Sequence, residues 1–372
     1  MNIPDCKHFS GYKPCFPGTN CLRDGCIDPQ PIGTKILIIN LDAMGNVLVT
    51  TSLLPAIKRK YPVSSISWIT MPNVYPLLSG NPLIDRIYKW EPQSWMMLRA
   101  MDFDVVMNFD KSVQTGAFIN SLHAIQKLGY GITETGVIIP LNEEAEYNYQ
   151  LGLDDYCKFR INQKPNPQLL AEAVGIEYGR DEYNLQLTPE ELTYCEEYKR
   201  EVHIKPGALT VGFNTGCSLL YPNKKMTIDQ HIVLIEMLAK TGNINLVLLG
   251  GPEDTERNAE IKRRTGDRVV NTPTMNSVRK GVCYENICDV IITGDSFGMH
   301  VAIALKKFVI VWFGVSCPQE IDLFDRGVKL IPEGLECSPC WKKECPYGTE
   351  CIQMVDLERM VEEVNTFKRA TL

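Results

Sequence analysis

The sequence predicts an α/β protein built from two doubly wound domains, and three observations support this fold class. The chain has 372 residues, enough for two domains of ordinary size. Short apolar runs bounded by turns alternate with amphipathic stretches, as in buried parallel strands and the helices that connect them. The same alternation starts again after a Pro-Gly joint at 206–207. We therefore expect two Rossmann-like domains that face each other across a cleft.

The composition excludes several classes of protein. Hydrophobic residues make up 44% and charged residues 22% of the chain, as in soluble globular proteins. The longest apolar runs, such as 309–315, are far shorter than the ~20 residues of a membrane-spanning helix. The N-terminus lacks the basic-then-apolar pattern of a secretory signal, so we expect a cytoplasmic protein. A net charge of −7 argues against a nucleic-acid partner.

Residues 1–34 are expected to form a Cys-rich arm. Pro, Gly and Cys recur there at short intervals, no helical or strand period is visible, and the segment ends in the turn-rich DPQPIG. Its cysteines contain no CxxC pair. They either form a second metal site or pin the arm against the body of the protein. The four are Cys6, Cys15, Cys21 and Cys26.

The first domain is predicted over residues 35–190. Its strands are expected at 35–40, 65–70, 85–90 and 102–110, with a helix at 46–60 after the first of them. The stretch 188–208 reads as an exposed helix followed by the Pro-Gly joint, and we treat 191–207 as the linker to the second domain.

The second domain is predicted over residues 208–354 and is followed by a C-terminal helix in 355–372. Apolar residues at 357, 360, 361 and 364 form one face of that helix. Ligands of such sheets bind beyond the carboxyl ends of the strands, so the loops that follow the strands are the candidate site. The expected strands are 209–214, 244–251, 289–295 and 308–315, and the expected helices are 227–240, 253–265 and 298–307.

The loop after strand 289–295 suits a phosphate or pyrophosphate. It places Asp295, Ser296, Gly298 and His300 at the start of a helix, where backbone N–H groups are unpaired and the helix dipole is positive. The alternative is that Asp295 or Ser296 is only an N-cap, with His300 packed beneath it.

Two other loops of this domain carry polar groups. Thr215 and Ser218 offer hydroxyls, and Lys224 and Lys225 follow them. A lysine there can neutralise a leaving diphosphate, although exposed lysines are more often simply solvated. Glu253, in a Gly-rich turn, can accept hydrogen bonds from a nucleoside or can favour the dipole of the next helix.

The most specific pattern lies near the C-terminus. Cys337-x2-Cys340-x4-Cys345-x5-Cys351 is a tetrathiolate spacing for zinc or iron. Such a closed set leaves no open coordination position, so the metal would be structural. The alternative is that these four cysteines are unrelated thiols that bind no metal. The remaining cysteines are interpreted as core or incidental thiols: Cys157, Cys195, Cys217, Cys283, Cys288 and Cys317.

Taken together, the order and spacing of these stretches resemble glycosyltransferase family 9, the ADP-heptosyltransferases, which have the GT-B fold. The resemblance covers about residues 35–365. It is carried by KILIINLDAMGNVLVTTSLLPAIKRKYP, SISWIT, NPLIDRIYKW, the GGPED turn, ITGDSFGMHVAIALKKFVIVWFG and CSPCWKKECP. The cysteine-bearing stretch is similar to that of the autotransporter heptosyltransferases, protein-modifying enzymes whose C-terminal cysteines hold iron. This implies a metal at the four C-terminal cysteines and a large, ring-like homo-oligomer.

The resemblance also implies roles for the candidate residues. The family binds acceptor on its N-terminal domain and nucleotide-sugar on its C-terminal domain, and it inverts the anomeric centre without a covalent intermediate. Thr215 and Lys224 would face the diphosphate and Glu253 the nucleoside. The sugar-diphosphate would be met by Asp295, Ser296, Gly298, Met299 and His300. The family commonly has Gly then Pro where this chain has Phe297 and Gly298.

One departure concerns the general base. The family has an acidic residue directly after the glycine of the first strand-to-helix turn, but here Gly45 is followed by Asn46. An amide cannot accept a proton near neutral pH. Asn46 is an inactivating change, or Asp42 on the same loop supplies the carboxylate, or the chain binds sugar nucleotide without transferring it. Our hypothesis is that Asp42 is the base.

The function that follows is an inverting glycosyltransferase. It would move a heptose or related sugar from a nucleoside-diphosphate donor, ADP-linked under the resemblance, to a protein or glycan hydroxyl. No divalent metal is needed at the active site, because Lys224 and the helix start near Asp295 can hold the diphosphate. The alternatives are a nucleotide-sugar epimerase of the same architecture and a nucleotide-sugar-binding pseudoenzyme or scaffold.

Overall fold

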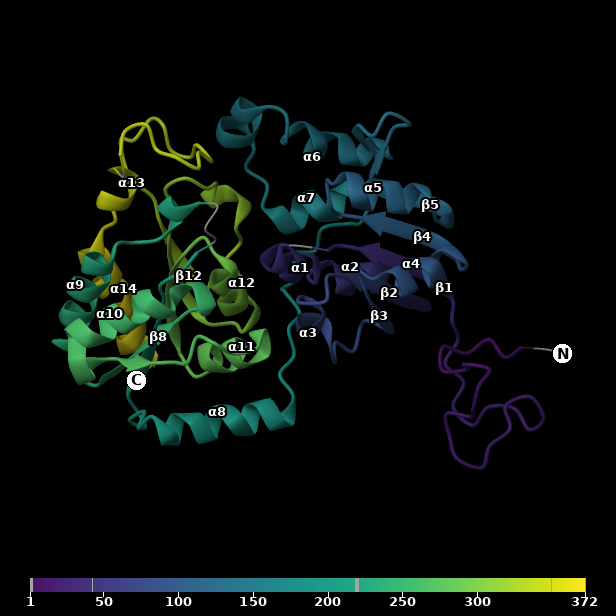
Figure 1. The fold of residues 1–372 in the computed structure, drawn as a ribbon, viewed down its shortest axis with the longest axis horizontal. Coiled ribbons are helices and arrows are strands. Elements are labelled where there is room, and N and C mark those ends of the chain that lie inside the picture. Colours follow the sequence, from purple (N-terminus) through teal and green to yellow (C-terminus); the bar gives the residue numbers. More distant parts are fainter. Residues whose placement is uncertain (1–2, 42, 218–220, 349, 372) are drawn as a thin grey trace. The chain divides into compact units, whose positions relative to one another are not determined.

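The computed structural model describes residues 3–41, 43–217, 221–348 and 350–371 (Figure 1). It contains two compact units, each built around its own six-stranded sheet. The first unit comprises Met1–Ala43, Thr50–Asp154 and Pro167–Asp181, and the second comprises Met44–Val49, Asp155–Asn166 and Glu182–Leu372. The predicted fold class, two doubly wound α/β domains, is confirmed.

The first sheet has the strand order β3-β2-β1-β4-β5-β6. Its neighbours pair in parallel except β5 and β6, which are antiparallel. Four strands match the predicted ones, whereas β5 and β6 were not predicted. The first half of β5 is largely exposed and contains Gln126 and Lys127, so it has no continuous apolar run. The strands are β1 (Thr34–Ile39), β2 (Ser64–Thr70), β3 (Arg86–Lys89), β4 (Asp102–Asn108), β5 (His123–Ile132) and β6 (Ile138–Pro140).

The predicted helix at 46–60 is in fact two helices, α1 (Met44–Thr50) and α2 (Leu53–Lys60). The core of the first unit forms where Leu37 and Ile39 of β1 and Val106 of β4 pack against Phe118. These strand residues are fully buried, as expected for central parallel strands. The other helices of this part of the chain are α3 (Tyr75–Leu78), α4 (Pro92–Arg99), α5 (Val113–Asn120), α6 (Glu146–Gln150) and α7 (Asn166–Ala173).

The second sheet has the strand order β12-β11-β10-β7-β8-β9, and neighbouring strands among its described residues pair in parallel. Four of its strands match predicted ones. The short strands β9 and β12 at the two edges were not predicted, and each is only partly buried. The strands are β7 (Leu209–Asn214), β8 (Ile244–Leu249), β9 (Val270–Asn271), β10 (Val290–Gly294), β11 (Phe308–Trp312) and β12 (Gly327–Leu330).

The helices α9, α10 and α12 begin and end near the predicted positions, whereas α11 and α13 were not predicted. Thr227 starts α9 through a reciprocal capping box with Gln230. The expected apolar face of α14 is confirmed, because Met360 and Val364 are fully buried in the core of this unit. In Figure 1, α14 lies beside α9. The helices are α8 (Pro189–Glu201), α9 (Ile228–Ala239), α10 (Thr255–Thr265), α11 (Val278–Asn286), α12 (Phe297–Ala304), α13 (Glu350–Gln353) and α14 (Leu357–Thr371).

Helix α8 was expected to be exposed, but one of its faces is buried. Cys195 and Tyr198 are each less than 5% exposed, and α8 contacts α11. Arg279 of α11 donates a 2.7 Å hydrogen bond from Nε to Glu191 Oε1. The helix is therefore part of the second unit rather than a free connection.

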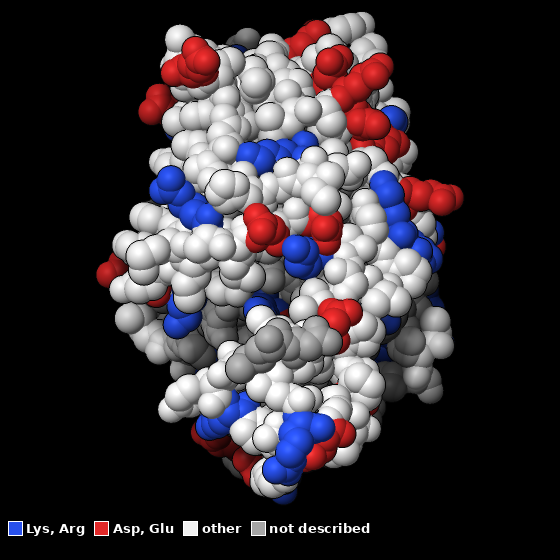
Figure 2. Space-filling view, turned by 90° about the vertical axis from the view of Figure 1, so that its right-hand side faces the viewer, with Lys and Arg blue, Asp and Glu red and all other residues white. Residues whose placement is uncertain are grey.

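The surface is of mixed charge on the face drawn in Figure 2. Blue lysine and arginine side chains and red acidic side chains are interspersed there, and acidic groups gather toward the top of the view. Among the residues that the structure describes, no helix combines the length and hydropathy that crossing a bilayer would require.

Candidate functional site

The candidate site of the second unit lies at the carboxyl ends of β7 and β10. These strands are neighbours in the sheet, and the chain continues to β8 and β9 on one side and to β11 and β12 on the other. This is a topological switch point, the usual ligand position in an open α/β sheet. Asn214 ends β7, and Asp295 and Ser296 follow β10.

An asparagine links the two strand ends. Asn214 Nδ2 donates to Ser296 Oγ at 2.7 Å and to Thr293 Oγ1 at 3.1 Å. Ser296 is the N-cap of α12, and its Oγ accepts from the Met299 N–H at 3.5 Å. A β-carbon on Gly298 would lie 2.3 Å from Asn214 Nδ2, so a glycine is required there. Ser296 is thus the cap that one interpretation expected, and Asn214 was not among the predicted site residues.

A buried ion pair lies beside this cap. Lys224 Nζ donates to Asp295 Oδ2 at 2.6 Å, and the two side chains are only 11% and 13% exposed. Burial by itself raises the pKa of Asp295. The Lys224 ammonium, His300 and a hydrogen bond with Ser316 outweigh this effect, so the pKa of Asp295 lies below its ordinary value. Asp295 is therefore an anion at neutral pH that holds Lys224 in place.

The indole of Trp341 covers Lys224. The ammonium nitrogen lies 4.0 Å from the Trp341 ring centroid and 5.3 Å from that of Tyr221, within cation–π range. Trp341 has φ +50°, an uncommon conformation for a bulky residue. The backbone N–H groups of Cys340 and Trp341 donate to Val315 O at 3.1 and 2.8 Å. The loop that contains Cys340 and Trp341 thus forms one wall around the Lys224 side chain.

His300 lies next to the ion pair and is 8% exposed. Burial lowers its pKa to about 4, and Asp295 opposes this shift less strongly, so the ring is neutral near pH 7. Its Nδ1 is buried and has no hydrogen-bond partner among the described residues. A β-carbon on Gly45, which belongs to the second unit, would lie 2.5 Å from His300 Cδ2. The glycine before exposed Asn46 is thus required by the histidine ring.

The other residues that were predicted to bind the nucleotide-sugar differ in how exposed their side chains are. Thr215 is fully buried, and its hydroxyl donates to Asn258 Oδ1 at 2.5 Å. Glu253 is exposed in the turn Pro252–Asp254 before α10. Ser218 and Asp42 lie outside the described residues. The hydroxyl of Thr215 therefore ties its loop to α10.

In the first unit, Asp110 organises the carboxyl edge of the sheet. It follows β4, and its two carboxylate oxygens accept from Asn40 Nδ2 and from the Leu41 N–H, both at 2.6 Å. This contact fixes the end of β1 just before α1, the helix that contains Asn46. Sequence reasoning missed Asp110, although a carboxylate at the end of the predicted strand 102–110 is the signal that could have found it.

The four C-terminal cysteines come together in space. Cys337, Cys340, Cys345 and Cys351 line a single cavity, with Val315 among its apolar walls. Burial, followed by the three neighbouring thiols, raises the pKa of Cys351. Within the described part of the chain, no three His, Cys, Asp or Glu side chains form a preset metal-binding group. The residues fit a thiophilic ion by chemistry and proximity, without preset coordination distances.

Acidification from pH 6.5 toward 4 is expected to lower the free energy of unfolding. Burial lowers the pKa of His300 to about 4 and that of His231 to about 3, both from 6.5. The unfolded chain therefore binds more protons in this window, and the stability present above pH 6.5 is lost as the pH falls. Denaturant unfolding at several pH values measures this loss. His231→Gln should flatten the profile, whereas His123→Gln, at an exposed position, should not. A flat wild-type profile would contradict the assignment.

The chain is similar to known heptosyltransferases over most of its length. It is 22% identical over 355 residues to lipopolysaccharide heptosyltransferase 1 of Campylobacter coli, covering 89% of this chain and 98% of that protein. It is 24% identical over 179 residues to lipooligosaccharide heptosyltransferase 2 of Campylobacter jejuni, covering 46% of this chain and 56% of that protein.

Solved structures share the fold. The E. coli ADP-heptose LPS heptosyltransferase II superposes with a TM-score of 0.66 at 19% identity, covering 91% of this chain and 99% of that one. The iron-containing dodecameric glycosyltransferase TibC of enterotoxigenic E. coli superposes with a TM-score of 0.56 at 12% identity, covering 94% and 82%. The sequence profile of glycosyltransferase family 9 (heptosyltransferase) matches residues 93–350, more than half of the chain. By this match and by the agreement of its two-sheet fold, the chain belongs to glycosyltransferase family 9.

Proposed function

We propose that this chain is an inverting glycosyltransferase that moves a heptose or related sugar from an ADP-linked donor to a hydroxyl of a protein or glycan. The observation that carries the proposal is the buried Lys224–Asp295 pair at the switch point of the second sheet. A buried lysine held by a carboxylate beside a helix start is suited to a diphosphate. The ADP-heptose named for the related E. coli enzyme supports the choice of donor.

In this proposal the donor diphosphate lies against Lys224 and the start of α12. Charge develops on the diphosphate as the sugar–oxygen bond breaks, and the Lys224 ammonium offsets it. The N–H groups of the first turn of α12, that of Gly298 among them, are directed to the same place. Asp295 and Trp341 restrict the lysine to one position, so little reorganisation accompanies the reaction.

The sugar and the nucleoside would be bound by the neighbouring groups. The neutral ring of His300 has an unpartnered Nδ1, which can exchange one hydrogen bond with a sugar hydroxyl. Ser296 and Met299 position the start of α12 through the cap. Exposed Glu253 can accept from the nucleoside, and Ser218 adds a hydroxyl on the loop after β7. Thr215 contributes by holding that loop.

Deprotonation of the acceptor hydroxyl is assigned to Asp42. The side chain at the usual position is the amide Asn46, which cannot accept the proton. Asp42 is four residues earlier in the sequence and directly follows Leu41, whose N–H donates to Asp110. An enzyme with this arrangement transfers the sugar in one displacement, with inversion.

The C-terminal cysteines would hold a structural iron or zinc ion. Cys337, Cys340, Cys345 and Cys351 provide four thiolates, and the closed set would leave no open position for substrate. When bound, the ion would cross-link the loop that carries Trp341. TibC, described as iron-containing and dodecameric, supports both a metal and a homo-oligomeric assembly for this chain.

Incubation with ADP-heptose and a panel of other nucleotide-sugars tests the proposed function. We expect a candidate protein or glycan acceptor to gain the mass of one sugar, and the new linkage to have the opposite anomeric configuration from the donor. Conversion of the donor in the absence of any acceptor would instead indicate an epimerase. Calorimetry that detects no nucleoside diphosphate binding to the folded chain would indicate a scaffold and contradict the proposal.

A further inference from the structure

We infer that the N-terminal arm is a metal-binding module in which four cysteines hold one zinc or iron ion, separately from the glycosyl-transfer site. The cysteines are far from any CxxC spacing, at intervals of nine, six and five residues along the chain. The fold nevertheless brings all four to the wall of one cavity, which His8 also lines. They are Cys6, Cys15, Cys21 and Cys26.

A glycine in each intervening loop returns the chain to this cavity. One glycine lies between each successive pair of cysteines, and all three adopt positive φ, between +70° and +78°. This conformation is strained for other residues and reverses the direction of the chain. At each of these glycines, no atom lies within 4 Å of the position that a β-carbon would occupy. Packing therefore does not explain why these positions are glycine. The three are Gly11, Gly18 and Gly25.

The arm has no hydrophobic core of its own that could hold these turns. Residues 3–33 contain turns but no helix or strand. Among these residues, only Cys6 is buried. Segments below ~40 residues usually need disulfides or metals to fold. No disulfide is present among the described cysteines. Five large apolar side chains of the arm are instead exposed: Ile3, Tyr12, Phe16, Leu22 and Ile27.

Cys6 has the surroundings of a metal ligand. It is only 6% exposed, and its cavity is also lined by His8, Phe9 and Cys26. Groups packed around a ligating sulfur fix its orientation. The Lys7 N–H donates to Gln30 O at 2.8 Å, which closes the arm into a loop around this sulfur.

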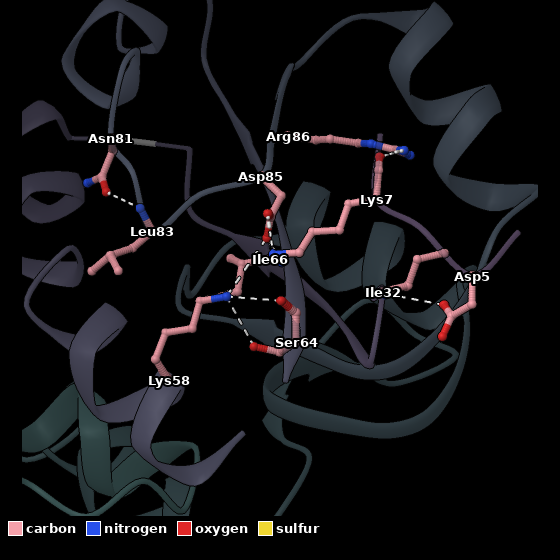
Figure 3. Close-up of polar contacts among 10 residues, drawn as sticks. All are labelled: Asp5, Lys7, Ile32, Lys58, Ser64, Ile66, Asn81, Leu83, Asp85 and Arg86. Atoms are coloured by element: carbon pink, nitrogen blue, oxygen red, sulfur yellow. Dashed lines mark hydrogen bonds and ion pairs between the residues drawn. The ribbon is translucent and has the colours of Figure 1, made fainter. Parts of the chain in front are cut away.

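Lys7, the residue after Cys6, anchors the arm to the first domain, and Asp5, the residue before it, bonds within the arm, as Figure 3 shows. Lys7 Nζ lies 2.9 Å from Asp85 Oδ1, and the other oxygen of Asp85 accepts from the Ile66 N–H of β2 at 2.8 Å. Arg86 Nη2 donates to Lys7 O at 3.1 Å. Asp5 Oδ1 accepts from the Ile32 N–H at 3.2 Å. An ion bound at Cys6 would therefore order a module that is already attached to the sheet.

The chemistry favours a tetrahedral thiophilic ion. Four thiolates suit Zn²⁺ or iron, and neither Mg²⁺ nor Ca²⁺ prefers sulfur. Because no described group is preset at coordination distance, the ion itself would draw the sulfurs together, as in small domains whose folding is coupled to metal binding.

Metal analysis of the full chain, purified from cells supplied with zinc and iron, tests this inference. Relative to the wild type, Cys6→Ser/Cys21→Ser should lose about one ion per chain. Cys337→Ser/Cys340→Ser probes the C-terminal site separately, and Cys157→Ser is a matched control outside both groups. Unchanged metal content in a folded Cys6→Ser/Cys21→Ser variant would overturn the inference. Neither result depends on sugar transfer, so the outcome is independent of the proposed enzymatic activity.

A second measurement uses the wild-type chain and requires no variant to fold. Alkylation followed by mass spectrometry should show Cys15, Cys21 and Cys26 protected, although Cys15 is exposed and the other two are half-buried. A chelator should abolish this protection. Immediate modification of all three without chelator, or a mass that reveals disulfides among them, would overturn the inference.

Discussion

Asp42→Asn is expected to reduce sugar transfer by ~10²–10⁴-fold, the usual contribution of a general base. Asparagine has nearly the same size and keeps hydrogen-bonding capacity, but it cannot accept the proton of the acceptor hydroxyl. Donor affinity should not change, because the diphosphate is assigned to residues of the other domain. Steady-state kinetics with saturating donor, together with calorimetric titration of ADP, separate the chemical step from binding.

Asn46 provides the matched comparison for Asp42. Asn46→Ala should affect turnover far less than Asp42→Asn does if Asp42 is the base. Asn46→Asp places a carboxylate at the position that the family uses, so Asp42→Asn/Asn46→Asp should recover much of the lost activity. If Asp42→Asn leaves turnover unchanged while Asn46→Asp increases it, Asp42 is not the base.

Lys224→Met is expected to lower kcat by ~10²–10³-fold, the typical cost of removing one group that stabilises developing charge. It should also weaken ADP binding. Methionine is apolar and of similar length, but it removes the ammonium, which lies 4.0 Å from the Trp341 ring centroid. Lys225→Met changes the adjacent lysine, which lacks the ion pair with Asp295, and should have a much smaller effect. Equal losses in the two variants would contradict a specific role for Lys224.

Removal of Lys224 also affects stability, and this effect can be separated from the chemistry. The single change leaves the buried Asp295 without its partner, which costs about 3–5 kcal/mol in comparable cases. Lys224→Met/Asp295→Asn removes both charges and should regain most of the free energy of unfolding. If the double variant recovered activity together with stability, Lys224 would have only a structural role.

The sheets were predictable because most of their strands are buried on both faces. Such strands must be continuous apolar runs, and β1, β7 and β10 show this in the sequence. The edge strands β9 and β12 and the polar half of β5 have no such run, because solvent covers part of them. The break between α1 and α2 was also missed, since the apolar period continues across it.

Two of the loops proposed for the site, those after β7 and β10, lie at neighbouring strand ends, but the contacts within them were not predicted. Lys224 and Asp295 were proposed separately, and only folding shows that they form one buried pair 71 residues apart in sequence. Trp341 was overlooked because nothing in the local sequence connects it to a lysine more than a hundred residues earlier. Thr215 has the residue type of a phosphate ligand, but its hydroxyl is directed to Asn258.

The two-domain α/β architecture, the family and the two groups of four cysteines could all be predicted from the order of residues. These features depend on the order and spacing of residues along the chain, which can be read without coordinates. The folded chain was needed to show that Asn214 bridges β7 and β10, that Trp341 covers Lys224 and that the arm cysteines share one cavity. Such contacts join distant segments, and their energies depend on burial and distance, which exist only in the folded chain.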